Sequence, residues 1–361
     1  MNTSAPVAAF FTSAALAFIF SFILVKIAYK YNIFTDLDEN NFKQKKTPTG
    51  GGIALVVSLV ISLLITRLMF GYIFSGVDEH ISYTLLLVAF ALIFALGVYD
   101  DLKGADAFKK FFFQIMAAIL IYLAGFKIAE ISIPFLGTKS IGIHILPLVL
   151  TILWVVGITN AVNIMDGLDG LALGISFFAS LSLGILALLS AQYHIVLIIA
   201  VLLGAMIGFY PFNFPRAKIY LGDSGSLFIG FMLAVLSMAK IHRKVSLAIA
   251  LMIPIIILLL PILETLVTIT RRIYRRKSIF IRDTDHFHYR FLKKGFTETK
   301  TTLFLIFISF LFSLAGILFE FVQTKLRLLL FVLILLICFF LLGYLGYHNI
   351  FPKQKRQTPG E

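Results

Sequence analysis

The residues best suited to chemistry in this chain are carboxylates, amides and imidazoles in four polar segments that separate long apolar stretches. The first segment holds two adjacent acids, Asp100 and Asp101, directly after an apolar stretch. Acids at the C-terminal end of a helix oppose the helix dipole by roughly 0.3–1 kcal/mol, which favours a compensating cation such as Mg²⁺. An isolated pair of acids is more often a solvated helix end, so this segment alone does not establish a metal site.

The second segment repeats a polar residue at every third position, which are Asn160, Asn163, Asp166 and Asp169. Residues three apart share a helical face or follow one turn, so the four side chains could converge on one ligand. Glycines after both aspartates allow a close approach of backbone. Capping of the following helix would explain one aspartate but not the whole series.

The third segment runs from Asn213 through Tyr220 to Asp223 and a Gly/Ser-rich turn. If a helix begins here, its unpaired N–H groups and positive dipole end suit an anion, and Asp223 could hold a metal ion. An ordinary N-cap is the alternative. Glycine-rich turns also precede the apolar stretches near residues 52 and 170, so three helix N-termini could form a shared phosphate basin beside Lys46.

The fourth segment, residues 271–300, is rich in arginine and contains His286, His288 and Arg290. Two imidazoles are too few for a convincing zinc site. Recognition of a diphosphate by His and Arg is better supported, and a merely positive loop is the alternative. The nearby Glu264 could be functional or could pair with an arginine, and we assign it no role. Two prolines, at 254 and 261, predict a kink in the preceding helix.

The elements that must position these segments are membrane helices. The 361 residues are 60% hydrophobic and 14% charged, which excludes a soluble globular protein. The apolar stretches are about 18–25 residues long, enough to cross a bilayer as helices. We therefore expect an all-α, polytopic membrane bundle of about eleven transmembrane helices. The expected spans are residues 7–25, 52–74, 82–99, 111–126, 143–159, 170–190, 193–210, 224–239, 246–270, 302–320 and 328–347.

The charges indicate orientation and the side of the chemistry. The loops after odd-numbered spans and the C-terminal tail hold 23 of the 31 basic residues, so the N-terminus is expected outside and the C-terminus in the cytoplasm. The formal charge of +13 then indicates topology and contact with anionic lipids rather than nucleic acid. Twelve of the 18 acids lie in or beside the same loops, whereas the span centres are almost free of charge. This pattern favours a reaction at the cytoplasmic interface over transport.

Taken together and in this order, the four segments resemble the polyprenyl-phosphate N-acetylhexosamine-1-phosphate transferases, over about residues 36–295. Members of that family transfer a sugar 1-phosphate from a UDP-sugar to a membrane polyprenyl phosphate and release UMP. The specific part is Asn-x-x-Asn-x-x-Asp-Gly-x-Asp-Gly followed by Gly-Asp-Ser-Gly-Ser. The span count resembles the branch that includes WecA and TagO rather than the MraY branch. One departure is His286-Phe287-His288-Tyr289, where the family has His-x-His-His.

The resemblance implies roles for individual residues. Asp223 and Asp101 would hold Mg²⁺, for which Mn²⁺ could substitute, and Asp100 and Asp101 would act in catalysis. The implied substrate contacts are Lys46, Asn160, Asn163, Asp166, Asp169, Asn213, Tyr220, His286, His288 and Arg290. Among these, Asp169, Asn213 and Tyr220 would hold the uridine. The expected organisation is one catalytic domain, residues 1–350, with active-site loops at about 31–51, 100–110, 160–170, 211–224 and 271–301, and a basic tail, 351–361.

The activity expected from the resemblance is transfer of N-acetylglucosamine 1-phosphate from UDP-N-acetylglucosamine to undecaprenyl phosphate in a bacterial inner membrane, which initiates a cell-surface polysaccharide. Another UDP-N-acetylhexosamine or the UDP-muramyl-pentapeptide donor stays open, because residues 45–51 partly resemble the MraY branch. From other classes, a nucleotide-sugar or lipid-linked sugar transporter and a non-catalytic scaffold are the alternatives. Direct displacement is favoured over an aspartyl-phosphate on Asp100. The expected partners are the UDP-sugar, the polyprenyl phosphate and membrane lipids, and a homodimer is compatible with the sequence.

Overall fold

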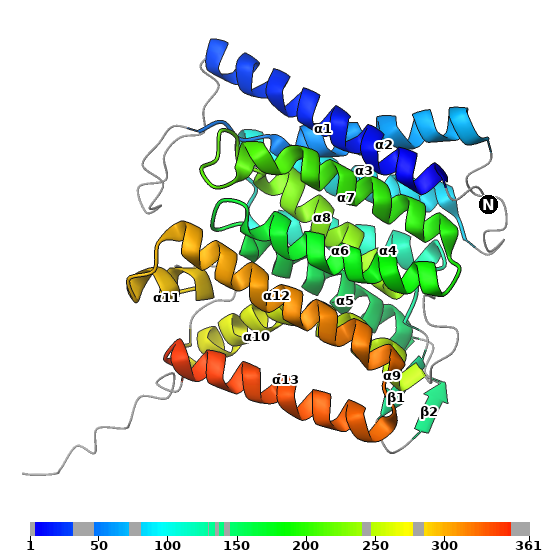
Figure 1. Ribbon diagram of the computed structural model, residues 1–361, viewed down its shortest axis with the longest axis vertical. Coiled ribbons are helices and arrows are strands. Elements are labelled where there is room, and N and C mark those ends of the chain that lie inside the picture. Colours follow the sequence, from blue (N-terminus) through cyan, green and yellow to red (C-terminus); the bar gives the residue numbers. More distant parts are fainter. Residues whose placement is uncertain are drawn as a thin grey trace, which may run out of the picture.

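The computed structural model describes residues 4–31, 47–71, 81–128, 130–133, 137–140, 145–239, 247–276 and 285–347. Within these ranges the chain forms a bundle of α-helices with one short β-hairpin (Figure 1). The helices are α1 (Ser4–Lys30), α2 (Gly51–Phe70), α3 (Tyr83–Lys103), α4 (Ala107–Leu123), α5 (Ile145–Met165), α6 (Leu171–Leu189), α7 (Tyr193–Asn213), α8 (Gly222–Met238), α9 (Leu247–Ile257), α10 (Leu259–Tyr274), α11 (Phe287–Lys293), α12 (Glu298–Phe321) and α13 (Thr324–Tyr344).

Long apolar helices dominate the described part of the chain. Eight of them are long and apolar enough to cross a membrane, and α8 is a shorter apolar helix. Continuous apolar composition over about 20 residues suits a helix in a bilayer because the helix satisfies all of its internal backbone hydrogen bonds. The prediction of an all-α, polytopic membrane protein is therefore confirmed. The count of eleven spans and the orientation stay predictions.

The ninth expected span is two helices rather than one. The expected stretch 246–270 is divided between α9 and α10, and Leu258 lies at the break between them. Pro261 has no N–H to donate to the carbonyl of Ile257, so the helical hydrogen-bond ladder is interrupted at this point. The kink expected from the two prolines is thus present. Each of the other expected stretches overlaps one helix of the described part of the chain. Helix α5 extends to Met165, so Asn160 and Asn163 lie in a helix and not in the expected loop 160–170.

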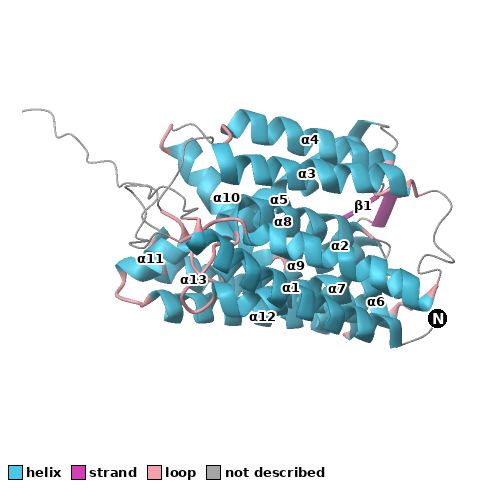
Figure 2. Cartoon of the chain, turned by 90° about the horizontal axis from the view of Figure 1, so that it is seen from above, coloured by secondary structure: helices cyan, strands magenta, loops and turns pink. Residues whose placement is uncertain are grey.

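Two local elements were not expected from the sequence. Between α4 and α5, strands β1 (Glu130–Ile133) and β2 (Gly137–Ser140) pair antiparallel, with Glu130 opposite Ser140 and Ile133 opposite Gly137. The longest expected loop contains the short helix α11. The hairpin and α11 lie at opposite ends of the bundle (Figures 1 and 2). Neither element has the long apolar period that makes membrane helices easy to recognise.

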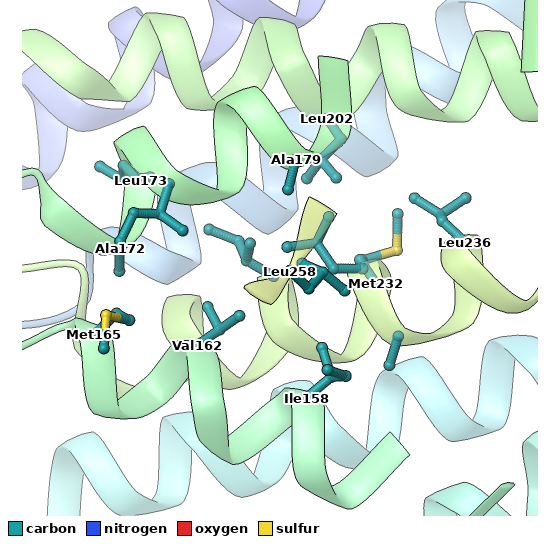
Figure 3. Close-up of a cluster of buried hydrophobic side chains, with 14 of the residues drawn as sticks. Ile158, Val162, Met165, Ala172, Leu173, Ala179, Leu202, Met232, Leu236 and Leu258 are labelled. Carbon is teal, nitrogen blue, oxygen red and sulfur yellow. The ribbon is translucent and has the colours of Figure 1, made fainter. Parts of the chain in front are cut away.

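Helix α8 lies at the centre of the bundle and packs against α2, α3, α5 and α6. Apolar side chains from α5, α6, α7 and α8 meet Leu258 in one buried cluster (Figure 3). The beginning of α8 approaches α2 and α3 closely, because a Cβ at Gly52 would lie 2.1 Å from the backbone nitrogen of Gly225 and one at Gly97 would lie 2.5 Å from the Cα of Ser224. These contacts bring the third polar segment against the first.

Candidate active site

Asp101 joins the end of α3 to the beginning of α8. Its Oδ1 accepts the backbone N–H of Asp223 at 2.7 Å, and its Oδ2 accepts that of Ser224 at 3.1 Å. The first N–H groups of a helix have no partner within the helix, so a carboxylate placed here satisfies them and meets the positive end of the helix dipole. The acid at the end of α3 is therefore compensated by α8. Its predicted roles in metal binding and catalysis stay predictions.

A second carboxylate pair converges on a lysine. The ammonium group of Lys110, in the first turn of α4, contacts Oδ2 of Asp100 and Oδ2 of Asp223. The backbone N–H of Ala105 also donates to Asp100. Asn163 donates its amide to Oδ1 of Asp223 at 3.0 Å. Four helices, α3, α4, α5 and α8, thus place two carboxyl groups and one ammonium group together, and carboxyl oxygens are ligands that a divalent cation can take.

The described residues contain no group of three or more His, Cys, Asp or Glu side chains that could hold a metal ion. Mg²⁺ differs from Zn²⁺ and Ca²⁺ in this respect, because it commonly takes one or two carboxylates and completes its octahedron with water and substrate phosphate oxygens. Two converging carboxylates are therefore compatible with magnesium.

The four polar residues of the second segment have different partners. Asn160 forms a reciprocal amide pair with the buried Gln114 of α4, at 2.6 and 3.3 Å, whereas Asn163 contacts Asp223. Asp169 accepts the backbone N–H of Ala217 at 2.8 Å. The backbone N–H of Asp166 donates to the carbonyl of Asn163 in the turn after α5. Asn160 and Asn163 lie in α5, which ends at Met165, whereas Asp166 and Asp169 lie in the turn after it. Their convergence on one ligand stays a prediction.

Asn213 connects the second and third segments from a buried position. Its Oδ1 accepts the backbone N–H of Gly170 at 2.9 Å, and its Nδ2 donates to the carbonyl of Ile219 at 3.1 Å. Tyr220 is half-buried, and burial raises the pKa of its phenol. Its backbone N–H donates to the carbonyl of Pro48 at 2.8 Å. The predicted substrate residue Lys46 lies outside the described residues.

The expected phosphate basin of unpaired N–H groups is wrong for the described donors. The N–H groups of Gly51 and Gly52 donate to the carbonyls of Tyr220 and Leu221, both at 2.9 Å. The N–H of Gly170 donates to Asn213, and the first N–H groups of α8 donate to Asp101. The polar segments pack on one another, so each helix start meets an acceptor from another segment. The sequence cannot show this pairing because it depends on contacts between distant residues.

The histidine segment is anchored on α10. Oε1 of the fully buried Glu264 lies 2.7 Å from Nδ1 of His286, and Oε2 accepts from the backbone N–H of Phe287 at 2.8 Å. His288 is buried against Gly167, where a Cβ would lie 2.2 Å from the imidazole Nε2. Both predicted histidines are therefore held close to the second polar segment. The neighbouring Tyr289 stands where the family has a third histidine, and burial raises the pKa of its phenol.

Arg290 is engaged within the protein. Its guanidinium donates to both oxygens of Asp285, at 2.9 and 2.7 Å, and to the carbonyl of Leu345 at 2.8 Å. It also lies 3.7 Å from the ring centroid of Tyr347. The planar guanidinium group of Arg290 therefore binds a carboxylate of the protein, whereas the sequence predicted that it binds a diphosphate. The contacts observed here give Arg290 a function in joining the histidine segment to the end of α13.

Comparison with known proteins decides the family. The family described as glycosyl transferase family 4 matches residues 83–241, which include Asp100, Lys110, Asn163 and Asp223. The probable undecaprenyl-phosphate N-acetylglucosaminyl 1-phosphate transferase of Bacillus subtilis (strain 168) is 34% identical over 333 residues, which cover 92% of this chain and 89% of the relative. The chain belongs to the polyprenyl-phosphate N-acetylhexosamine-1-phosphate transferases.

Relatives from two branches of this transferase family cover less of the chain. The decaprenyl-phosphate N-acetylglucosaminephosphotransferase of Mycobacterium tuberculosis (strain ATCC 25618 / H37Rv) is 33% identical over 283 residues, 72% of this chain and 69% of the relative. The phospho-N-acetylmuramoyl-pentapeptide-transferase of Lactiplantibacillus plantarum is 30% identical over 271 residues, 72% of this chain and 79% of the relative. Similarity to both branches agrees with the mixed motifs in the sequence.

The sequence did not single out two residues of this transferase, Lys110 and Gln114, and it named Glu264 without a role. Lys110 and Gln114 are four residues apart on α4, so they share a helical face that points at α5 and α8. A polar pair with this spacing in an otherwise apolar helix was the available signal. The sequence does not separate Lys110 from the neighbouring Lys109, which is exposed and pairs with Asp106 at 3.1 Å.

Proposed function

We propose that the protein transfers N-acetylglucosamine 1-phosphate from UDP-N-acetylglucosamine to undecaprenyl phosphate, with release of UMP. The observation that carries this proposal is the meeting of Asp100, Lys110 and Asp223 at one point, in a chain of this transferase family. Two acids and a lysine can hold both the metal ion and the phosphate groups that such a transfer requires. The lipid-diphosphate-linked sugar would initiate a cell-surface polysaccharide.

The residues present fit a magnesium ion. The ammonium group of Lys110 contacts both carboxylates, which indicates that Asp100 and Asp223 are close enough to share one cation. Both oxygens of Asp101 already bind the beginning of α8, so we propose Asp100 rather than Asp101 as the second ligand beside Asp223. Bound here, Mg²⁺ would neutralise the diphosphate and the charge that develops on UMP. Mn²⁺ takes similar oxygen ligands and would substitute.

The protein groups around this pair would orient the reactants. Asn163 holds Asp223 in place, and Lys110 would turn to the phosphate oxygens of the donor. A phosphate monoester has a second pKa of about 6, so most of the lipid acceptor is ionised at pH 7 and needs no strong base. An oxygen of the lipid phosphate attacks the sugar-linked phosphorus, and the bond from this phosphorus to the bridging oxygen breaks as UMP leaves. Asp100 would position the acceptor.

The remaining predicted contacts divide into two groups in this proposal. Asp166, Asp169 and Tyr220 would line the nucleoside part of the cleft, and Lys46 with the two histidines would lie near the diphosphate. Asn160 and Asn213 would act indirectly, because their amides bind protein groups. Asn160 holds α5 against α4, and Asn213 holds the start of α6 against the third segment. The loops expected on this side hold 23 of the 31 basic residues in the sequence, so this side would face the cytoplasm of a bacterial cell.

One assay tests the activity. Purified protein in detergent receives Mg²⁺, undecaprenyl phosphate and a panel of labelled UDP-sugars, and UMP and lipid product are measured. UDP-N-acetylglucosamine should give both products. A preference for the UDP-muramyl-pentapeptide donor would instead support the branch of the Lactiplantibacillus plantarum relative. Flux of intact UDP-sugar into vesicles without UMP would contradict the enzyme proposal, and a phosphorylated protein formed without lipid would replace direct displacement by an aspartyl-phosphate.

A further inference from the structure

Glu264 is a buried acid that the proposed reaction does not use. It lies in α10 and has no exposed surface. Burial of a carboxylate is costly unless hydrogen-bond donors surround it. Here three donors do so: the ring of His286, the backbone N–H of Phe287 and the hydroxyl of Thr268, which donates at 3.1 Å. Two of the three belong to the histidine segment, so the acid is placed to control that segment.

The contact with His286 selects one form of the imidazole. An ionised carboxylate can only accept hydrogen bonds, and both oxygens of Glu264 already accept from Thr268 and Phe287. The contact of 2.7 Å from Nδ1 to Oε1 therefore places a ring proton on Nδ1. Nε2 is then the nitrogen that remains for a ligand, since a hydrogen bond at one ring nitrogen determines the chemistry of the other.

The chain on both sides of His286 is held rigidly. The preceding residue, Asp285, is clamped by Arg290 and contacts Arg271 at 3.3 Å. The following residue, Phe287, is completely buried and donates its backbone N–H to Glu264. The imidazole of His286 also stacks on that of His288, with 5.7 Å between the ring centroids. The backbone therefore fixes the position of the ring, and Glu264 fixes its rotation and its proton.

His288 connects this arrangement to the second polar segment, because its ring packs on Gly167 between Asp166 and Asp169. We infer that Glu264 is a positioning residue that holds the Nε2 of His286 ready for the phosphate groups of the UDP-sugar. This inference rests on the proposed function. A ring that is already oriented loses less conformational entropy when the donor binds, so the benefit should appear in donor affinity rather than in the chemical step.

The test is a double-mutant cycle on donor binding. Glu264→Gln keeps the size of the side chain but replaces one accepting oxygen by a donor. It should raise the Kd for UDP, measured by calorimetry, and the KM for UDP-N-acetylglucosamine by about tenfold, with kcat changed by less than about threefold. In a His286→Ala background the same substitution should change the Kd by less than about twofold, since Glu264 then has no ring to orient.

The control is Glu320→Gln, which changes an acid at the far end of α12, away from the polar segments, and should leave the Kd for UDP unchanged. If Glu264 has a merely structural role, the fold-changes in the Kd for UDP caused by Glu264→Gln and by His286→Ala should multiply in the double variant. This result would overturn the inference. So would an active Glu264→Gln protein that binds UDP as the unsubstituted protein does. If the unsubstituted protein binds UDP but releases no UMP, the proposed function fails while the cycle still tests the positioning role.

A second variant covers the case in which Glu264→Gln does not fold. Thr268→Val removes the hydroxyl that donates to Oε1 of Glu264 and that also lies 3.5 Å from Nδ1 of His286. It should raise the Kd for UDP by about threefold in the normal background and not at all beside His286→Ala. An equal rise in both backgrounds would contradict the inference, because it would show that the α10 contacts act on binding without His286.

Discussion

The carboxylate cluster and the histidine segment use similar residues for different ends. At the carboxylate cluster, Asp100 and Asp223 share a single ammonium group, and we propose that their oxygens also take a metal ion. In the histidine segment, Asp285 is clamped between two arginines, and Glu264 is surrounded by donors. In the first region the carboxyl groups are available to a ligand. In the second region the charged side chains bind other protein groups and hold the two imidazoles in place. A charged motif in this sequence therefore predicts which region a residue lies in more reliably than it predicts whether that residue contacts a ligand.

The largest effect is expected at the carboxylate cluster. Asp223→Asn should lower kcat by about a thousandfold, because loss of metal-bound charge stabilisation amounts to several kcal/mol at about 1.4 kcal/mol per tenfold. UMP release measures the rate, and Mn²⁺ binding followed by electron paramagnetic resonance measures the metal. Asp106→Asn, which changes an exposed acid nearby, should keep the activity. Full magnesium-dependent turnover by Asp223→Asn would show that the cluster is not the metal site.

A pair of neighbouring lysines tests whether the cluster needs its cation. Lys110→Met should lower kcat/KM for the UDP-sugar by about a hundredfold, since a charge that stabilises phosphate oxygens in the transition state is lost. The matched control is Lys109→Met, which removes an exposed lysine bound only to Asp106 in the contacts described here. Steady-state kinetics of UMP release should separate the two variants. Equal losses in both would mean that general positive charge, rather than the position of Lys110, matters.

A smaller effect, of a different kind, is expected in the histidine segment. Arg290→Gln should lower the free energy of unfolding by about 2 kcal/mol, because it breaks charge-assisted hydrogen bonds to Asp285. The Kd for UDP of the folded protein should change by less than about threefold. Unfolding in detergent and calorimetry give the two quantities, with the exposed Arg275→Gln as control. Normal stability with a large loss of UDP affinity would restore Arg290 as a diphosphate ligand.

The smallest effect concerns Asp106, the N-cap of α4. The backbone N–H of Lys109 donates to its carboxylate at 2.8 Å and lowers the pKa of Asp106 below 3.8. A lowered pKa in the folded protein stabilises the fold above the pKa of the unfolded chain, and this stabilisation is lost as the pH falls through the folded value. Asp106→Ala should therefore lower the melting temperature slightly at pH 7 and by less near pH 3. A constant difference across this range would contradict the assignment.

The membrane helices could be predicted from the sequence because continuous apolar runs of about 20 residues have few other stable forms in a bilayer. The kink near Leu258 was also predictable, because proline breaks a helix by local chemistry. The order of the polar segments was enough to identify the family. The hairpin β1–β2 and the helix α11 were not predictable in this way, because short elements depend on neighbouring segments more than on their own pattern.

The sequence by itself determined which residue types gather between the helices, and so the candidates for metal, phosphate and nucleoside contacts. Only the tertiary structure decided which candidate meets which partner: Asp101 binds the start of α8, Asp100 meets Asp223 at Lys110, and Arg290 binds Asp285. The physical reason is that hydrogen bonds and ion pairs act over a few ångströms between residues that can be more than a hundred positions apart, as Asp101 and Asp223 are. Hydropathy is a local property of the chain, whereas this pairing follows from how the helices pack.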